Sequence, residues 1–130
     1  MKISIFFISW ILISLFIISC VKIEPRKVVP LEFKEGQRHF HRVCANCHGA
    51  DVMGSTKAPK LIQEKYYQVD FPNRKIKSTI LNGSTSGSMP SQKHRVSEKE
   101  IKEVIKYIRY VQKESRFLGE KNVPSKVINK

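Results

Sequence analysis

The most regular pattern of apolar and polar positions lies in the last third of the chain. The apolar side chains there recur at spacings of three and four residues, at Ile101, Val104, Ile105, Ile108 and Val111. Basic side chains fill the opposite face, at Lys102, Lys106, Arg109 and Lys113. This spacing predicts an amphipathic helix, and the pair Ser97 and Glu100 predicts a capping box at its start. Residues 115–130 are expected to form a loose basic tail.

Two shorter stretches also have helical character. Residues 34–43 and 75–81 are helix candidates, and Asn82-Gly83 is a stop signal for the second. Between them, residues 49–75 predict a long wrapping segment with at most one or two short helices. No segment alternates with the two-residue period of a strand, so we expect an all-α fold of about three to five helices. Such a wrapping segment fits a compact domain only if something other than protein fills the middle.

The N-terminal stretch has the pattern of an export signal, because a short positive start precedes an uncharged run over residues 3–21. Its end, Ile17-Ile18-Ser19-Cys20, resembles the lipobox of bacterial lipoproteins, which implies a lipid on Cys20 and cleavage before it. We therefore expect a signal peptide over 1–19, a tether over 20–31 and a lipid-anchored domain on the periplasmic side of a bacterial membrane. An uncleaved helical anchor and a soluble secreted product are the alternatives. All three export the domain.

Composition narrows the classes of protein further. The 130 residues allow one domain, and residues 1–19 supply a large share of the 41% that are hydrophobic. The core that remains is thin, which favours a disulfide, a metal or a large cofactor as a staple. Three cysteines are too few for a disulfide framework. The formal net charge of +13 favours acidic partners, and export argues against nucleic acid.

One five-residue motif supplies candidate chemistry for the missing core. Cys44-Ala45-Asn46-Cys47-His48 is the C-x-x-C-H signature of c-type haem attachment. Two thiols three positions apart on a helical turn can each add to one haem vinyl group, which directs the adjacent His48 at the iron. A thioredoxin-like thiol site is an alternative, although no strand precedes the motif. A zinc site is another, with His39, His41 and His94 as the other available ligands.

The surroundings of this motif resemble a class I monohaem cytochrome c over residues 32–114. The resemblance is carried by Gly36 and Phe40 before the motif, by Ala58-Pro59-Lys60-Leu61 after it, and by Gly87-Ser88-Met89-Pro90. It implies one covalent haem c, wrapped by the helices and attached through Cys44 and Cys47. It also implies that Phe40 packs against the last helix, with Val104 and Tyr107 as partners.

The resemblance further implies two iron ligands. These are His48 as the proximal ligand and Met89 as the distal ligand, with the Pro59 carbonyl accepting the Nδ1–H of His48. His94 is the rival for the distal position. For His39 and His41 we expect solvated or capping roles.

These features predict a membrane-tethered, monomeric, one-electron carrier with no catalytic residues of its own. Its partners would be an acidic reductase and an acidic oxidase, docking on a basic rim near the haem opening, which we define as Lys57, Lys60, Lys93 and Arg95. One alternative is a fixed haem subunit of a larger quinol-oxidising or terminal oxidase complex. An alternative of another class is a C-x-x-C thiol-disulfide lipoprotein.

Overall fold

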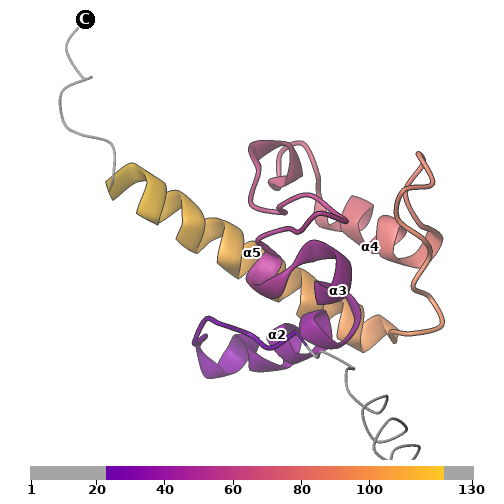
Figure 1. Cartoon of the computed structure of the whole chain (residues 1–130), viewed down its shortest axis with the longest axis horizontal. Coiled ribbons are helices and arrows are strands. Elements are labelled where there is room, and N and C mark those ends of the chain that lie inside the picture. Colours follow the sequence, from indigo (N-terminus) through magenta and orange to yellow (C-terminus); the bar gives the residue numbers. More distant parts are fainter. Residues whose placement is uncertain (1–22, 122–130) are drawn as a thin grey trace, which may run out of the picture.

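A computed structural model describes residues 23–121 of the chain, with the following helices in order (Figure 1). They are α2 (Leu31–Val43), α3 (Ala45–His48), the 3₁₀ turns η2 (Ala50–Val52) and η3 (Glu64–Tyr66), α4 (Asn73–Asn82) and α5 (Glu98–Lys121). The described part contains no strand, so the predicted all-α class is confirmed. The predicted signal peptide over 1–19 and Cys20 lie outside the described residues.

The core is organised by the close crossing of α2 and α5. Gly36 permits this approach, because a Cβ atom at that position would lie 2.2 Å from the Glu103 carbonyl oxygen. Phe40 and Tyr107 are fully buried at the crossing, with ring centroids 5.6 Å apart. The predicted packing of Phe40 against the last helix is therefore confirmed, four residues before the C-x-x-C-H motif.

The start of α5 agrees with the predicted capping box. The Ser97 backbone N–H donates to Glu100 Oε2 at 2.7 Å, and the Glu100 N–H donates to Ser97 Oγ at 3.3 Å. The end of the helix differs from the prediction, since α5 continues to Lys121 where a loose tail was expected from residue 115. The predicted end was wrong because Gly119 does not stop the helix, which instead runs past it without interruption.

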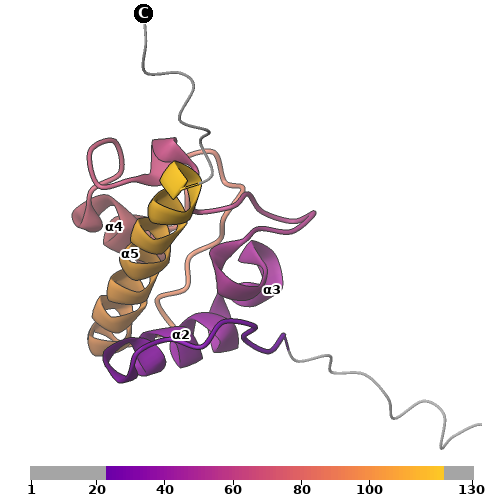
Figure 2. The ribbon, with the colours of Figure 1, turned by 90° about the vertical axis from the view of Figure 1, so that its left-hand side faces the viewer.

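The wrapping segment lies across α5 and connects α3 to α4, as two views at right angles show (Figure 2). Side chains of α5 hold its backbone. Arg109 donates to the carbonyl oxygens of Tyr66, at 2.8 Å, and of Phe71. Gln112, which is buried, donates to the carbonyl oxygens of Leu61 and Tyr66 at 2.7 and 3.0 Å. Arg109 was predicted on the basic face of the helix, opposite the apolar positions, and there it satisfies carbonyl groups of a segment that has little helix of its own.

The second half of the predicted tether is attached to the domain. The backbone N–H groups of Arg26 and Lys27 donate to Asp51 Oδ2 at 2.8 and 3.0 Å. Val29 is only 4% exposed, and Ile23 packs against the core cluster. The prediction of a free tether as far as residue 31 was therefore wrong for this part, because a buried carboxylate and an apolar contact hold it in place.

Candidate haem-binding site

The C-x-x-C-H motif forms one tight turn where α2 passes into α3. The N–H groups of Cys47 and His48 both donate to the Cys44 carbonyl oxygen, at 3.1 and 2.9 Å. Neither cysteine is in a disulfide; Cys44 is half-buried and Cys47 is exposed. Both thiols are thus presented from a single helical turn, as attachment to two vinyl groups of one macrocycle requires.

The electrostatics of Cys44 argue against a thiol-disulfide enzyme. Burial raises the pKa of its thiol to about 12, and the nearby charges of Arg95 and Arg42 oppose this rise without reversing it. Reactive thiols in C-x-x-C oxidoreductases have a lowered pKa, because the thiolate is the nucleophile. A zinc site also lacks support, since the described residues contain no group of three His, Cys, Asp or Glu side chains placed to hold a metal.

His48 is oriented by the loop that follows it. The chain reverses within Gly49–Gly54, where the Gly54 N–H donates to the His48 carbonyl oxygen at 2.7 Å and both glycines have positive φ. A Cβ atom on Gly49 would lie 2.0 Å from the Gly54 carbonyl oxygen, so only glycine permits this reversal. The segment that follows this loop places the Pro59 carbonyl oxygen 3.3 Å from His48 Nδ1.

This contact settles which ring nitrogen can bind a metal. A carbonyl oxygen only accepts, so Nδ1 carries the proton and Nε2 of His48 keeps its lone pair. Burial lowers the pKa of the His48 imidazole, and the bond to Pro59 opposes that shift. A neutral imidazole with a free Nε2 is the form that binds iron. The side chain therefore fits the role of an axial ligand.

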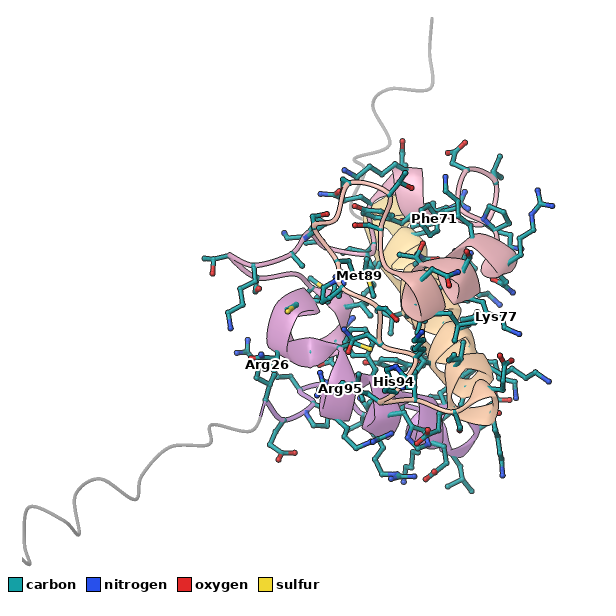
Figure 3. The ribbon with its side chains drawn as sticks, turned by 90° about the vertical axis from the view of Figure 1, so that its right-hand side faces the viewer. Arg26, Phe71, Lys77, Met89, His94 and Arg95 are labelled. Atoms are coloured by element: carbon teal, nitrogen blue, oxygen red, sulfur yellow. The ribbon has the colours of Figure 1, made fainter. Side chains whose placement is uncertain are left out.

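Met89 is held in a pinned loop between α4 and α5. Its N–H donates to Ser84 Oγ at 2.9 Å, and the Ser84 N–H donates back to the Met89 carbonyl oxygen at 2.9 Å. The exit of the loop is tied to the end of α4, because Ser91 Oγ donates to the Leu81 carbonyl oxygen at 2.5 Å. Met89 is half-buried and packs against the core cluster; its position is labelled in Figure 3.

The three remaining histidines take different positions. His94 is exposed, and Figure 3 places it nearer the start of α5 than Met89 lies. His39 is buried, with Nδ1 3.0 Å from Glu100 Oε1. His41 is buried, with Nδ1 2.8 Å from the Gln37 carbonyl oxygen. The expectation of a solvated position was therefore wrong for His39 and His41, since both side chains are buried.

A buried carboxylate three residues after His48 was missed by the sequence reasoning. Asp51 is 2% exposed, and its Oδ1 accepts hydrogen bonds from Tyr107 Oη at 2.8 Å and Gln37 Nε2 at 3.2 Å. Its Oδ2 accepts the hydrogen bonds from the backbone amides of Arg26 and Lys27 described above. Its backbone N–H donates to His41 Nε2 at 3.3 Å. Burial opposes ionisation, but these hydrogen bonds together hold the pKa of Asp51 below its usual range. A carboxylate is almost never buried unless paired in this way.

Residues 31–108 match the sequence profile of the family described as cytochrome c oxidase, cbb3-type, subunit III. The chain belongs to this family of c-type cytochromes. Over 74 residues it is 38% identical to a cbb3-type cytochrome c oxidase subunit CcoP from Rubrivivax gelatinosus, a match that covers 56% of this chain and 24% of that relative. The chain thus spans about a quarter of the curated relative's length. No solved structure matches it.

As a member of this cytochrome family, the chain carries covalently bound haem c and functions in electron transfer. The described residues fit that group, because one helical turn presents both thiols, the Pro59 carbonyl orients the His48 imidazole, and Ser84 holds the backbone of Met89. Apolar side chains from the wrapping segment and α4 lie only half-buried against this core, namely Leu61, Ile62, Phe71 and Leu81. None of the helices described is long and apolar enough to cross a bilayer.

Proposed function

We propose that this cytochrome is a membrane-attached electron-transfer subunit of an oxidase complex, with haem c bound through Cys44 and Cys47. The supporting observation is the convergence of the C-x-x-C-H turn with an imidazole whose Nδ1 is fixed by Pro59. The similarity to CcoP favours the fixed oxidase subunit over a freely diffusing carrier. The complex itself is part of the proposal, because only a quarter of CcoP is represented here.

In this proposal His48 and Met89 are the two axial ligands. Haem c supplies an iron that accepts and donates one electron at a time. The hydrogen bond to Pro59 orients the His48 ring and raises its basicity as a ligand. Ser84 holds the Met89 backbone at both its N–H and its carbonyl, so the thioether is preorganised. A methionine ligand raises the reduction potential, and two protein ligands leave no position for oxygen or peroxide.

The distal assignment is tested by replacing Met89 with alanine. A thioether ligand gives the oxidised protein a weak absorption band near roughly 695 nm, which we expect in the wild type. Met89→Ala removes this band, lowers the potential and allows carbon monoxide to bind, while the thioethers remain. Met53→Ala is the matched control, because Met53 is 40% exposed and lies in the loop after His48. If His94→Ala removes the band and Met89→Ala does not, the distal ligand is His94.

The oxidase-subunit assignment is tested by purification in mild detergent. The haem of this protein should co-elute with a larger complex that has oxidase activity, and elution as a separate small cytochrome would favour the diffusing carrier.

The proposed lipid anchor has its own test. Cys20→Ala should leave haem attachment intact but block processing or release the domain from membranes. A variant still cleaved after residue 19, and as resistant to carbonate washing as the wild type, would refute the lipid anchor.

A further inference from the structure

The attachment of residues 23–30, called the linker below, to the domain bears on how the protein lies relative to its membrane. Residues 23–30 run beside α2 in the direction opposite to the helix, and their backbone is held at Asp51 by the N–H groups of Arg26 and Lys27. Gln37 Nε2 of α2 donates to the Lys27 carbonyl oxygen at 2.8 Å. The chain is thus part of the folded domain from Ile23 onward.

The chain that remains between the domain and the membrane is very short. This step rests on the membrane attachment proposed above, in which either a lipid on Cys20 or an uncleaved apolar stretch ends near that residue. Only Val21 and Lys22 lie between Cys20 and Ile23, and a fully extended chain spans at most about 11 Å over these three Cα–Cα steps. The domain therefore cannot move away from the bilayer surface, and the side of the domain beside the linker must face it.

The side chains on that side suit a lipid surface. Val28 is 96% exposed and Leu31 is 81% exposed, although the intervening Val29 is buried. The segment 23–42 contains five Lys or Arg residues against three Asp or Glu. An excess of basic charge around exposed aliphatic side chains is the pattern of a surface that lies on anionic lipid.

We propose that the linker and α2 form a membrane-docking surface, with Val28 and Leu31 inserted among the headgroups of an anionic bilayer. Two views place α2 at one edge of the domain and the segment 61–71 at the opposite edge (Figures 1 and 2). The segment 61–71 then faces away from the bilayer. The orientation of the domain is fixed by the Asp51 hydrogen bonds, and the bilayer surface is its partner.

The test uses membranes that contain the haem-loaded full-length protein, supplemented with phosphatidylglycerol bearing a photoreactive group near the glycerol backbone. After irradiation, trypsin releases peptide 28–34, which carries Val28 and Leu31, and peptide 66–74, which carries Val69. Val69 is the matched control, because it is 92% exposed and belongs to the segment at the opposite edge. We expect lipid adducts on peptide 28–34 and none above background on peptide 66–74.

A pair of variants separates insertion from simple proximity. Val28→Asp combined with Leu31→Asp should reduce labelling of peptide 28–34 to the level of peptide 66–74, with an unchanged haem spectrum. Val69→Asp should leave the labelling of peptide 28–34 unchanged. Equal labelling of both peptides, or membrane-bound protein without adducts on peptide 28–34, overturns the docking surface. Absence of the protein from the membrane fraction instead overturns the proposed attachment.

Discussion

Replacing Tyr107 with phenylalanine tests the buried carboxylate on which the core depends. Tyr107 is fully buried, and its hydroxyl donates to Asp51 Oδ1 at 2.8 Å. Burial and the neighbouring carboxylate raise the pKa of Tyr107, so the hydroxyl stays protonated and remains a donor. Tyr107→Phe removes one oxygen atom and leaves the ring that packs on Phe40 in place.

The magnitude follows from the charge on the acceptor. A hydrogen bond to an ionised group contributes about 1.5–3 kcal/mol to stability. Oδ1 keeps the bond from Gln37, so the carboxylate is not left without a donor on that side. We therefore expect a loss of about 2 kcal/mol in the free energy of unfolding. With a slope of about 3 kcal/mol/M for a small domain in guanidinium, the unfolding midpoint of the haem-loaded protein falls by about 0.7 M.

Tyr110→Phe provides the control on the same helix. Tyr110 is half-buried and stacks on Phe33 at 4.3 Å, and its hydroxyl has no hydrogen-bond partner within residues 23–121. Its removal should change the free energy of unfolding by less than about 0.5 kcal/mol. Equal losses for the two variants would refute the reasoning, because the effect would then come from losing a tyrosine hydroxyl in general and not from the bond to Asp51.

Three further predictions concern stability and association. Arg109→Lys loses the paired bonds to the Tyr66 and Phe71 carbonyls and should lower the free energy of unfolding by about 1–3 kcal/mol, whereas Lys106→Gln on the exposed face should change it by less than about 0.5 kcal/mol. The folded-state pKa of Asp51 lies below its ordinary value of 3.8, so the stabilisation from this carboxylate is present above pH 3.8 and is lost as pH falls through the folded pKa. Unfolding measured over an acid titration should show this loss of stability. A stability that does not fall in this range would contradict the low pKa. The side chains of the basic rim are all exposed, so reduction of the cytochrome by its membrane partner should slow as salt rises. Charge reversal in the basic rim should slow this reduction further. A rate independent of salt would exclude electrostatic steering by that rim.

The sequence predicted the parts of the fold that depend on local patterns. The C-x-x-C-H spacing, the capping box of Ser97 and Glu100, and the apolar period of α5 each act within a few residues, and each is found in the structure. The packing of Phe40 on Tyr107 was predicted from the family resemblance, because glycine and an aromatic residue precede the motif at the family's spacing. Local chemistry and one family pattern were enough to locate the main helices, apart from the C-terminal end of α5.

The parts that were missed depend on contacts between residues far apart in sequence. Asp51 lies in a glycine-rich loop, where a carboxylate is expected to be solvated, and nothing nearby indicates that Tyr107 and two linker amides will surround it. Arg109 fits the basic face of α5 by periodicity, although its guanidinium reaches carbonyl oxygens some forty residues away in sequence. Periodicity identifies which face of a helix is polar, but it does not identify what that face contacts.

The position of Asp51 favours a fixed subunit over a carrier that swings on a long tether. The carboxylate follows His48 by three residues, so the loop that orients the proposed axial ligand also holds the linker. A tether that was free over residues 20–31 would allow the domain to reach successive partners, but Ile23, Arg26 and Lys27 are held against the domain. The short loop that contains Asp51 thus contacts the segment of the proposed membrane-docking surface and also orients the proposed iron ligand. Under the proposed membrane attachment, the haem site has one orientation relative to the bilayer, which suits a partner that is permanently placed in the same membrane.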